Sequence, residues 1–268
     1  MRRWTGDAPV EAGATWSRGE PSGGTAVVIT GRTVTDGSPS SWHRVLRTME
    51  RPEALLIDVY ETILTCDFRA HATELPALAG IPAQQWNAAF VPLGPALTDG
   101  RMTVARAFEH VLATCGRPPT ADIVDALCQR DRQLMVRWSR LFDDTAPFLR
   151  MARERGLRTV LVSNCSDTTR YLLEHLGVDE LVDAMVLSCE TGAAKPAPEI
   201  YKRALQEADA TPGSCLFLDD QARYCAGALD LGIRAVQVAR GTPVPGYVHE
   251  VADGAPVVKS FVEVEKHL

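Results

Sequence analysis

The chain has 268 residues, of which 46% are hydrophobic and 23% are charged, and its formal net charge at pH 7 is -6. This length suits one large α/β domain or a domain with an insertion, and the composition is that of a globular protein. Acidic and basic residues are interspersed, which disfavours the basic surface of a protein that binds nucleic acid or a membrane.

The cysteines and the N-terminus bear on the cellular compartment. Seven cysteines make an odd count with no Cys-x-x-Cys pair, which disfavours a disulfide framework and a zinc site and favours a reducing compartment. No apolar run approaches the length of a membrane span. Gly6, Asp7 and Glu11 lie where a signal peptide needs its apolar core. We therefore expect a cytoplasmic protein; nothing in the sequence indicates its oligomeric state.

Residues 1–52 differ from the rest of the chain because they are rich in Gly, Ser, Thr and Pro. Two short apolar segments, 26–30 and 33–35, are compatible with a small hairpin, and a short helix is expected over 41–49. The composition predicts a poorly ordered N-terminal extension without recognisable chemistry.

The apolar run 54–57 leads into Asp58 and then a polar turn. Such a run bounded by turn residues is typical of a buried strand in a parallel sheet. Ligands of open α/β sheets bind beyond the carboxyl ends of the strands, so Asp58 is a candidate nucleophile or metal ligand. Taken alone, this stretch is better explained by an ordinary aspartate that caps the loop after a strand.

Residues 68–141 are expected to form a helical block inserted between the first two strands. Amphipathic segments over 70–79, 83–91, 104–115 and 121–138 are separated by Gly- and Pro-containing breakers, including 92–95. An insertion at this edge of a sheet is well placed to act as a lid. A purely structural insertion is the alternative.

From Asp144 onward the pattern alternates regularly between strands and helices. The expected helices are 146–155, one that begins at Ser166 or Asp167 and ends before Gly177, 199–208 and 221–231; the expected strands are 159–162, 184–188, 215–218 and 235–238. This alternation predicts an α/β fold, a Rossmann-like three-layer α/β/α core with a parallel sheet. The core would comprise residues 53–67 and 142–268, with 68–141 as the inserted domain.

The candidate functional groups all follow the carboxyl ends of predicted strands. They are Asp58, the pair Ser163-Asn164, Lys195, and the pair Asp219-Asp220. Each alone has an ordinary explanation as a turn residue, a helix cap or a solvated lysine. Together they suit an anionic ligand and a hard divalent cation, since hydroxyl, amide and ammonium groups bind anionic oxygens and carboxylates bind the cation.

These residues resemble the four motifs of the haloacid dehalogenase-like (HAD) hydrolase superfamily, over about residues 52–238. The matching segments are Asp58–Thr62, where the family reads D-x-D-x-T, then 160–164, 192–201, and 216–220 followed by 226–228 and Gly232. The insertion over 68–141 is similar to the family's helical cap between the first and second motifs.

The resemblance implies a catalytic role for three residues. Asp58 would be the nucleophile that forms an aspartyl ester or aspartyl-phosphate, and Lys195 would steady both the nucleophile and the substrate. Tyr60 occupies the position of the family's acid/base aspartate. Substrate binding is implied for Thr62, Ser163 and Asn164.

The resemblance also implies a Mg²⁺ site. Its expected ligands are Asp58, the main-chain carbonyl of Tyr60 and the fourth-motif acids, with Asp220 as the direct ligand and Asp219 behind it.

Tyr60 departs from the phosphatase pattern, because a tyrosine with a pKa of about 10 is a poor base at neutral pH. Family 2-haloacid dehalogenases carry tyrosine there, but they lack the metal-binding acids that this chain keeps at Asp219 and Asp220. Glu61, where the family has glycine, is either a substitute acid or a turn residue. We favour a Mg²⁺-dependent phosphatase of a small phosphorylated metabolite. The alternatives are a dehalogenase-like substitution at carbon and a weakly active protein that binds a phosphorylated ligand.

Overall fold

The computed structural model describes residues 51–241, 250–265 and 268. The predicted extension, with its hairpin over 26–35 and its helix over 41–49, lies outside the described residues.

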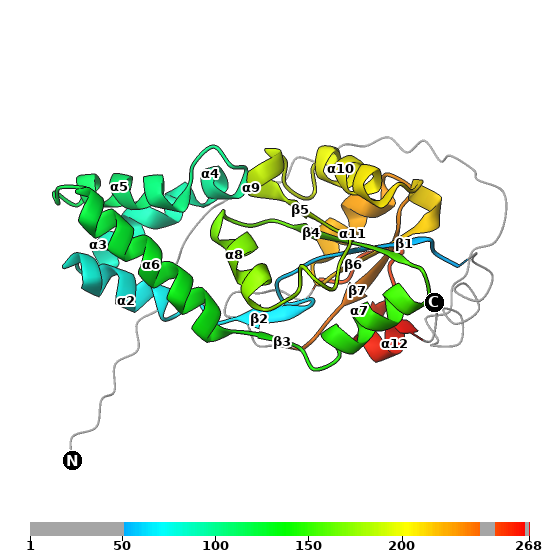
Figure 1. Cartoon of the computed structure of the whole chain (residues 1–268). Helices are drawn as coiled ribbons and strands as arrows, with labels where there is room; N and C mark the ends of the chain where they lie inside the picture. The colour runs from blue at the N-terminus through cyan, green and yellow to red at the C-terminus, as the bar shows by residue number, and fades with distance from the viewer. Residues whose placement is uncertain (1–50, 242–249, 266–267) are drawn as a thin grey trace, which may run out of the picture. The chain divides into compact units, whose positions relative to one another are not determined.

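The centre of the described chain is a six-stranded sheet in the order β5-β4-β1-β6-β7-β8, in which every neighbouring pair is parallel (Figure 1). The strands are β1 (Ala54–Ile57), β4 (Arg158–Ser163), β5 (Ala184–Leu187), β6 (Cys215–Asp219), β7 (Arg234–Val238) and β8 (Val257–Val258). β1 lies between β4 and β6, with Ile57 opposite Leu161 and Leu218. The prediction of a Rossmann-like parallel sheet is confirmed.

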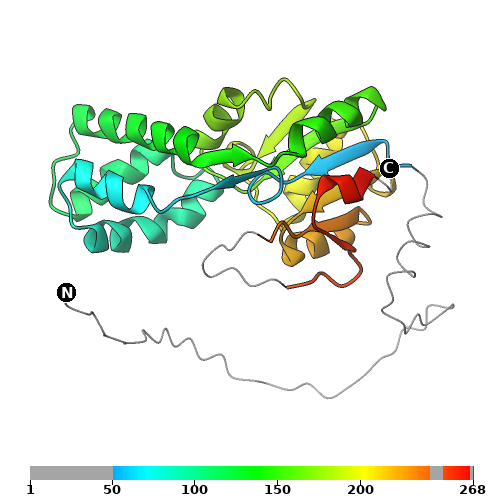
Figure 2. The same cartoon turned by 90° about the horizontal axis from the view of Figure 1, so that it is seen from below.

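Helices cover both faces of the sheet, as Figures 1 and 2 show. Side chains alternate along a strand, so Leu55 and Ile57 join one apolar cluster while Ala54 and Leu56 join the other. The first cluster contains residues of α7 (Thr145–Glu154), α8 (Thr168–His175) and α12 (Phe261–Glu265). The second contains residues of α10 (Pro198–Ala208) and α11 (Ala222–Leu229). This is the predicted three-layer arrangement.

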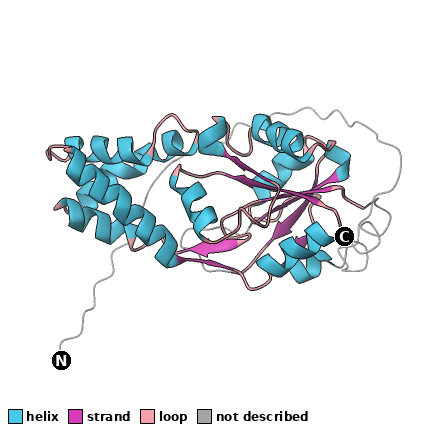
Figure 3. Ribbon diagram, viewed as in Figure 1, coloured by secondary structure: helices cyan, strands magenta, loops and turns pink. Residues whose placement is uncertain are grey.

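The helical block, defined as residues 67–138, is joined to the sheet by a short antiparallel pair, β2 (Leu64–Cys66) and β3 (Ser139–Leu141) (Figure 3). Its helices are α2 (His71–Ala79), α3 (Ala83–Phe90), α4 (Gly94–Thr98), α5 (Val104–Thr114) and α6 (Ala121–Trp138). They enclose an apolar core of their own around Trp86, Phe108 and Leu127.

The breaker predicted over 92–95 is wrong, because this segment is helical. It contains the 3-10 helix η1 (Val91–Leu93) and the start of α4. Pro92 and Pro95 occupy the first turns of these helices, where the missing N–H of proline costs nothing. Three further short helices were not predicted: α9 (Ser188–Thr191), η2 (Pro212–Ser214) and α12.

The helical block is also tied to the core by Asp167. This residue stands at the predicted start of α8, but its side chain makes no cap hydrogen bond there. Its Oδ1 instead accepts a hydrogen bond of 2.9 Å from the main-chain N–H of Val104, the first residue of α5. A core carboxylate therefore satisfies a free N–H at the start of a helix in the block. None of the helices in the described chain is long and apolar enough to cross a membrane.

Candidate active site

Asp58 stands directly beyond the carboxyl end of the central strand. All four residues of β1 are buried, and the main-chain N–H of Asp58 continues the sheet by donating to the carbonyl of Leu218 at 2.8 Å. Only 6% of Asp58 is exposed. The apolar strand thus fixes a carboxylate at the sheet edge where ligands of this fold class bind.

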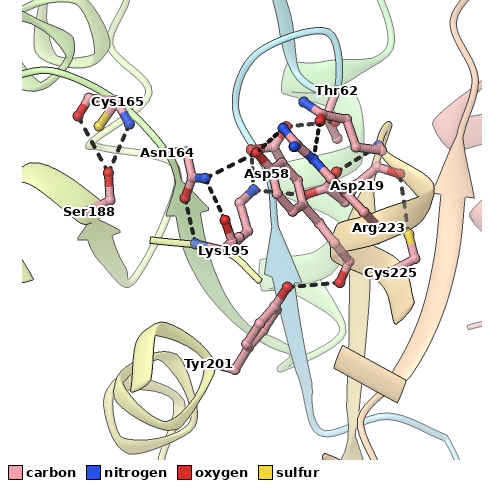
Figure 4. Close-up of polar contacts among 12 residues, drawn as sticks. Asp58, Thr62, Asn164, Cys165, Ser188, Lys195, Tyr201, Asp219, Arg223 and Cys225 are labelled. Carbon is pink, nitrogen blue, oxygen red and sulfur yellow. Dashed lines mark hydrogen bonds and ion pairs between the residues drawn. The ribbon is translucent and has the colours of Figure 1, made fainter. Parts of the chain in front are cut away.

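Lys195 links Asp58 to the fourth motif (Figure 4). Its buried ammonium Nζ lies 2.5 Å from Asp58 Oδ1 and 2.6 Å from Asp219 Oδ2. Burial acts to lower the pKa of Lys195, but the Asp219 and Asp58 carboxylates raise it more, and the net pKa lies above the ordinary value. Lys195 is therefore a fixed cation between two carboxylates.

The carboxylates of Asp58, Asp219 and Asp220 are all buried, and one oxygen of each lies within 4.8 Å of the others. Burial raises the pKa of Asp219; Lys195 opposes this shift, and the nearby Asp58 and Asp220 add to it. In this cluster three carboxylates share one ammonium group, so an excess of negative charge remains. Hard carboxylate oxygens at this spacing suit Mg²⁺, which would neutralise that excess.

Asn164 holds the main chain of Lys195 from both sides. Its Nδ2 donates to the Lys195 carbonyl at 2.8 Å, and its Oδ1 accepts from the Lys195 N–H at 2.7 Å. Nδ2 also donates to the Tyr224 hydroxyl at 3.1 Å. The Asn164 amide is therefore committed to the Lys195 loop rather than left open to a ligand.

Ser163, the preceding residue, is the last residue of β4 and is fully buried. Its Oγ has no hydrogen-bond partner among the described residues. Buried hydroxyl groups are normally satisfied, so Ser163 offers an unused donor at the sheet edge.

Hydrogen bonds of Thr62 with Asp58 and with Arg240 fix the loop after Asp58. Thr62 Oγ1 donates to Asp58 Oδ2 at 3.1 Å, and the Thr62 carbonyl accepts from Arg240 Nη2 at 2.8 Å. Arg240 is itself paired with Asp144, with Nη1 2.7 Å from Oδ2. Arg240 was not among the predicted site residues, although it follows the carboxyl end of β7 at the same sheet edge.

Tyr60 points to a different partner. Its hydroxyl lies 2.9 Å from Thr169 Oγ1, and burial raises its pKa well above the ordinary value of 10.0. The side chain lines a cavity of about 440 Å³ between the helical block and the core, which Asn164 and Thr169 also line. Tyr60 is therefore a neutral phenol in the wall of this cavity.

Glu61 adopts a left-handed backbone conformation with φ 57°, the region that favours glycine. Its Oε1 accepts from Thr65 Oγ1 at 2.8 Å. Glu61 thus takes part in the turn that leads into β2.

The structure brings most of the predicted residues into one network. Hydrogen bonds and ion pairs connect Thr62, Asp58, Lys195, Asp219 and Asn164. The Asp220 carboxylate lies in the same acidic cluster. The Tyr60 hydroxyl is directed to Thr169 instead.

Comparisons with known proteins bear on the family of this chain. The family model described as haloacid dehalogenase-like hydrolase matches residues 33–232. A protein of Mycobacterium tuberculosis named as a phosphatase is 36% identical over 114 residues, which are 41% of this chain and 52% of that protein. The chain spans about half the length of the first curated relatives that it matches.

Solved structures show the same fold. A HAD-family enzyme of Bacteroides thetaiotaomicron, determined as a magnesium complex, has a TM-score of 0.59 at 23% identity, covering 73% of this chain and 98% of that one. The L-2-haloacid dehalogenase of Xanthobacter autotrophicus with chloropropionic acid covalently bound has a TM-score of 0.55 at 20% identity, covering 80% and 97%.

Proposed function

Because the chain belongs to the haloacid dehalogenase-like hydrolases, we propose that it is a Mg²⁺-dependent phosphatase of a small phosphorylated molecule. The observation that carries this proposal is the buried cluster of Asp58, Asp219 and Asp220, with one oxygen of each within 4.8 Å of the others. A cluster of three acids is suited to neutralisation by a divalent cation. The phosphatase name of the Mycobacterium tuberculosis relative and the magnesium complex of the Bacteroides enzyme support the same reading.

Asp58 is the proposed nucleophile. Its carboxylate would attack phosphorus in line with the leaving oxygen and form an aspartyl-phosphate. Thr62 and Lys195 each hold one of its oxygens, which fixes the carboxylate for attack. Ser163, with its unused buried hydroxyl, would donate a hydrogen bond to an oxygen of the transferred phosphoryl group, and Lys195 would offset its charge.

The donors present fit a magnesium ion. Asp58, Asp220 and the main-chain carbonyl of Tyr60 would hold it, and when bound it would neutralise charge on the phosphoryl oxygens. Asp219 accepts hydrogen bonds at both oxygens, from Lys195 at 2.6 Å and from the N–H of Gln221 at 2.8 Å. Its proposed role is to hold Lys195 in place.

We assign Asn164 a positioning role, in place of the substrate binding that the family resemblance implies. Its amide makes two hydrogen bonds to the main chain of Lys195. These contacts place the Lys195 ammonium beside Asp58.

Tyr60 is expected to make hydrolysis of the aspartyl-phosphate, the second step of the reaction, slow. A phenol whose pKa lies above 10.0 is a poor base for the water that must hydrolyse the aspartyl-phosphate. It is also a poor acid for an alkoxide leaving group. We therefore expect slow turnover and a preference for esters of acidic alcohols, such as aryl phosphates.

The helical block is proposed to act as a cap. It supplies one wall of the cavity beside Tyr60 and Asn164, where the leaving group of a substrate bound at Asp58 would lie. Walls contributed by a separate element exclude water and select the leaving group.

A second candidate is dehalogenation of a 2-haloacid, in which Asp58 would attack carbon without a metal. Tyr60 favours it, because a halide needs no proton when it leaves. The lining of the cavity argues against dehalogenation. None of the described residues that line the cavity is Lys or Arg, so no such cation would bind the carboxylate of a haloacid there. The acidic pair Asp219-Asp220 would also repel such a carboxylate.

The deciding experiment measures product release from an aryl phosphate and from a short 2-haloacid, each with and without Mg²⁺. Phosphate release that requires both Mg²⁺ and Asp58, with Asp58→Asn as the control, is the expected result. Halide release without Mg²⁺ would establish the dehalogenase instead. A phosphorylated ligand that binds and is recovered unchanged would identify a binding protein.

A further inference from the structure

The cavity between the helical block and the core is mainly apolar. Its volume is about 440 Å³, and its aromatic walls include Phe68, Trp86 and Phe90. This volume lies in the lower part of the range for small-molecule sites, and it is about three times that of a cavity known to hold benzene. An aromatic ring with a short substituent would fit.

Two polar side chains of the helical block interrupt these apolar walls. His71, the first residue of α2, and Asp131, in the middle of α6, both line the cavity. Their side chains are only 13% and 11% exposed, and His71 Nε2 lies 3.6 Å from Asp131 Oδ1. This separation is too long for a hydrogen bond.

Both side chains have unused hydrogen-bonding atoms. Asp131 Oδ2 and both ring nitrogens of His71 are buried without a hydrogen-bond partner in the part of the chain that the structure describes. Asp131 as a whole is 8% exposed. Buried polar groups are normally satisfied, and two such residues on one cavity wall point to a ligand that satisfies them.

Aromatic contacts through Phe68 connect His71 to Tyr60 in the candidate active site. The Phe68 ring lies 5.5 Å from the His71 ring and 6.0 Å from the Tyr60 ring, between centroids. Tyr60 follows Asp58 by two residues. A leaving group that extends from a phosphoryl group at Asp58 past Tyr60 would therefore meet His71 and Asp131.

We propose that the His71–Asp131 pair selects phosphate esters whose apolar or aromatic leaving group carries a hydrogen-bond donor, a hydroxyl or an ammonium group, which Asp131 accepts. This inference rests on the proposed phosphatase function, since the selected group is the alcohol part of the ester. None of the described residues that line the cavity is Lys or Arg, so a donor from the ligand would supply the partner that Asp131 Oδ2 lacks.

The test compares three esters of similar size on the full chain with Mg²⁺: 4-ethylphenyl, 4-(hydroxymethyl)phenyl and 4-(aminomethyl)phenyl phosphate. We expect at least one of the two donor-bearing esters to exceed the ethyl ester about tenfold in kcat/KM, mainly through KM, which corresponds to about 1.4 kcal/mol. Asp131→Leu should abolish this preference. Asp131→Asn should remove a preference for the ammonium ester but keep one for the hydroxyl ester. Asp125→Asn, an exposed change on the same helix, should alter neither.

Equal kcat/KM for the three esters with the unaltered chain would overturn the inference and leave the phosphatase function intact. A preference that survives Asp131→Leu would also overturn it. If no ester releases phosphate, the phosphatase function fails, and calorimetry with the free alcohols becomes the test. Tighter binding of 4-(aminomethyl)phenol or 4-(hydroxymethyl)phenol than of 4-ethylphenol, lost in Asp131→Leu, would retain the specificity site, and equal binding would exclude it.

Discussion

The side-chain amide of Asn164 holds the main chain of Lys195 at both its carbonyl and its N–H, with hydrogen bonds of 2.8 and 2.7 Å. The carboxyl end of β4 is thereby joined to the loop that carries the only ammonium group in the described acidic cluster. The position of this ammonium group depends on a neighbouring strand, and not only on its own loop.

Replacing Asn164 should therefore impair turnover more than binding. Asn164→Ala removes the two hydrogen bonds to the Lys195 main chain, of about 1 kcal/mol each, and a third to the Tyr224 hydroxyl. We expect kcat for an aryl phosphate to fall about ten- to a hundredfold with a small change in KM. Gln129→Ala, an exposed change in α6, is the control. A rise in KM at constant kcat would instead identify Asn164 as a substrate-binding residue.

Mg²⁺ should stabilise the protein through the acidic cluster. A ligand present at a hundred times its Kd raises the free energy of unfolding by about 2.7 kcal/mol, so added Mg²⁺ should raise Tm. Asp220→Asn should remove most of this increase. Asp230→Asn, an exposed aspartate at the end of α11, should leave it unchanged. An equal rise in Tm for Asp220→Asn would show that the ion binds elsewhere.

Tyr60→Asp should restore the missing acid and base. General acid–base catalysis contributes about 10²- to 10⁴-fold, so kcat for an alkyl phosphate should rise, and more than kcat for an aryl phosphate, whose leaving group needs no proton. Tyr60→Phe is the matched variant, since it removes only the hydroxyl that contacts Thr169, and it should change both rates little. Halide release by the unaltered chain that is lost in Tyr60→Asp would contradict the phosphatase proposal.

The central fold could be predicted because its signals are local. β1, β4, β5 and β6 are short apolar runs that end in or lead directly into polar residues, β7 is a further short run of mostly apolar residues, and α5 and α6 carry helical apolar patterns. Parallel pairing then brings the strand ends to one edge. This is why Asp58, Lys195 and Asp219 were expected together and lie in contact.

The remaining features depend on pairing between distant segments. β2 and β3 have three residues each, which is too short for an alternating strand pattern to be recognised. They also lie on opposite sides of the helical block in the sequence, so their pairing has no local signal. His71 and Asp131 meet only because α2 packs on α6. The spacing of Asn164 predicts a position at the sheet edge, but it could not predict that the side-chain amide contacts the main chain of Lys195.

Glu61 offers a test of backbone conformation. Glu61→Gly and Glu61→Ala both remove the contact with Thr65, but only glycine adopts φ 57° without steric cost. The glycine variant should be the more stable of the two by about 1 kcal/mol, measured by urea unfolding. Equal stability of the two variants would argue against a left-handed conformation at this position.

Asp131 should make stability depend on pH. Burial, and next the Asp167 carboxylate, raise the pKa of Asp131 from 3.8 to about 7. A raised pKa means that the folded state holds the proton more tightly than the unfolded state. The resulting stabilisation is complete below the unfolded pKa of about 3.9 and is lost as the pH rises through about 7.

His71 acts in the opposite direction. Burial lowers its pKa from 6.5, so the stability associated with the neutral imidazole is present above pH 6.5 and is lost as the pH falls.

Because the two residues act in opposite directions, the measurement is the difference in unfolding free energy between the unaltered chain and Asp131→Asn, determined by urea unfolding from pH 4.5 to 8. We expect the unaltered chain to lose stability relative to Asp131→Asn as the pH rises, by at most about 4 kcal/mol, since each pKa unit is worth 1.36 kcal/mol. Asp125→Asn should follow the unaltered chain at every pH. Parallel curves for the unaltered chain and Asp131→Asn would show that the Asp131 carboxyl is not held in the apolar surroundings described above.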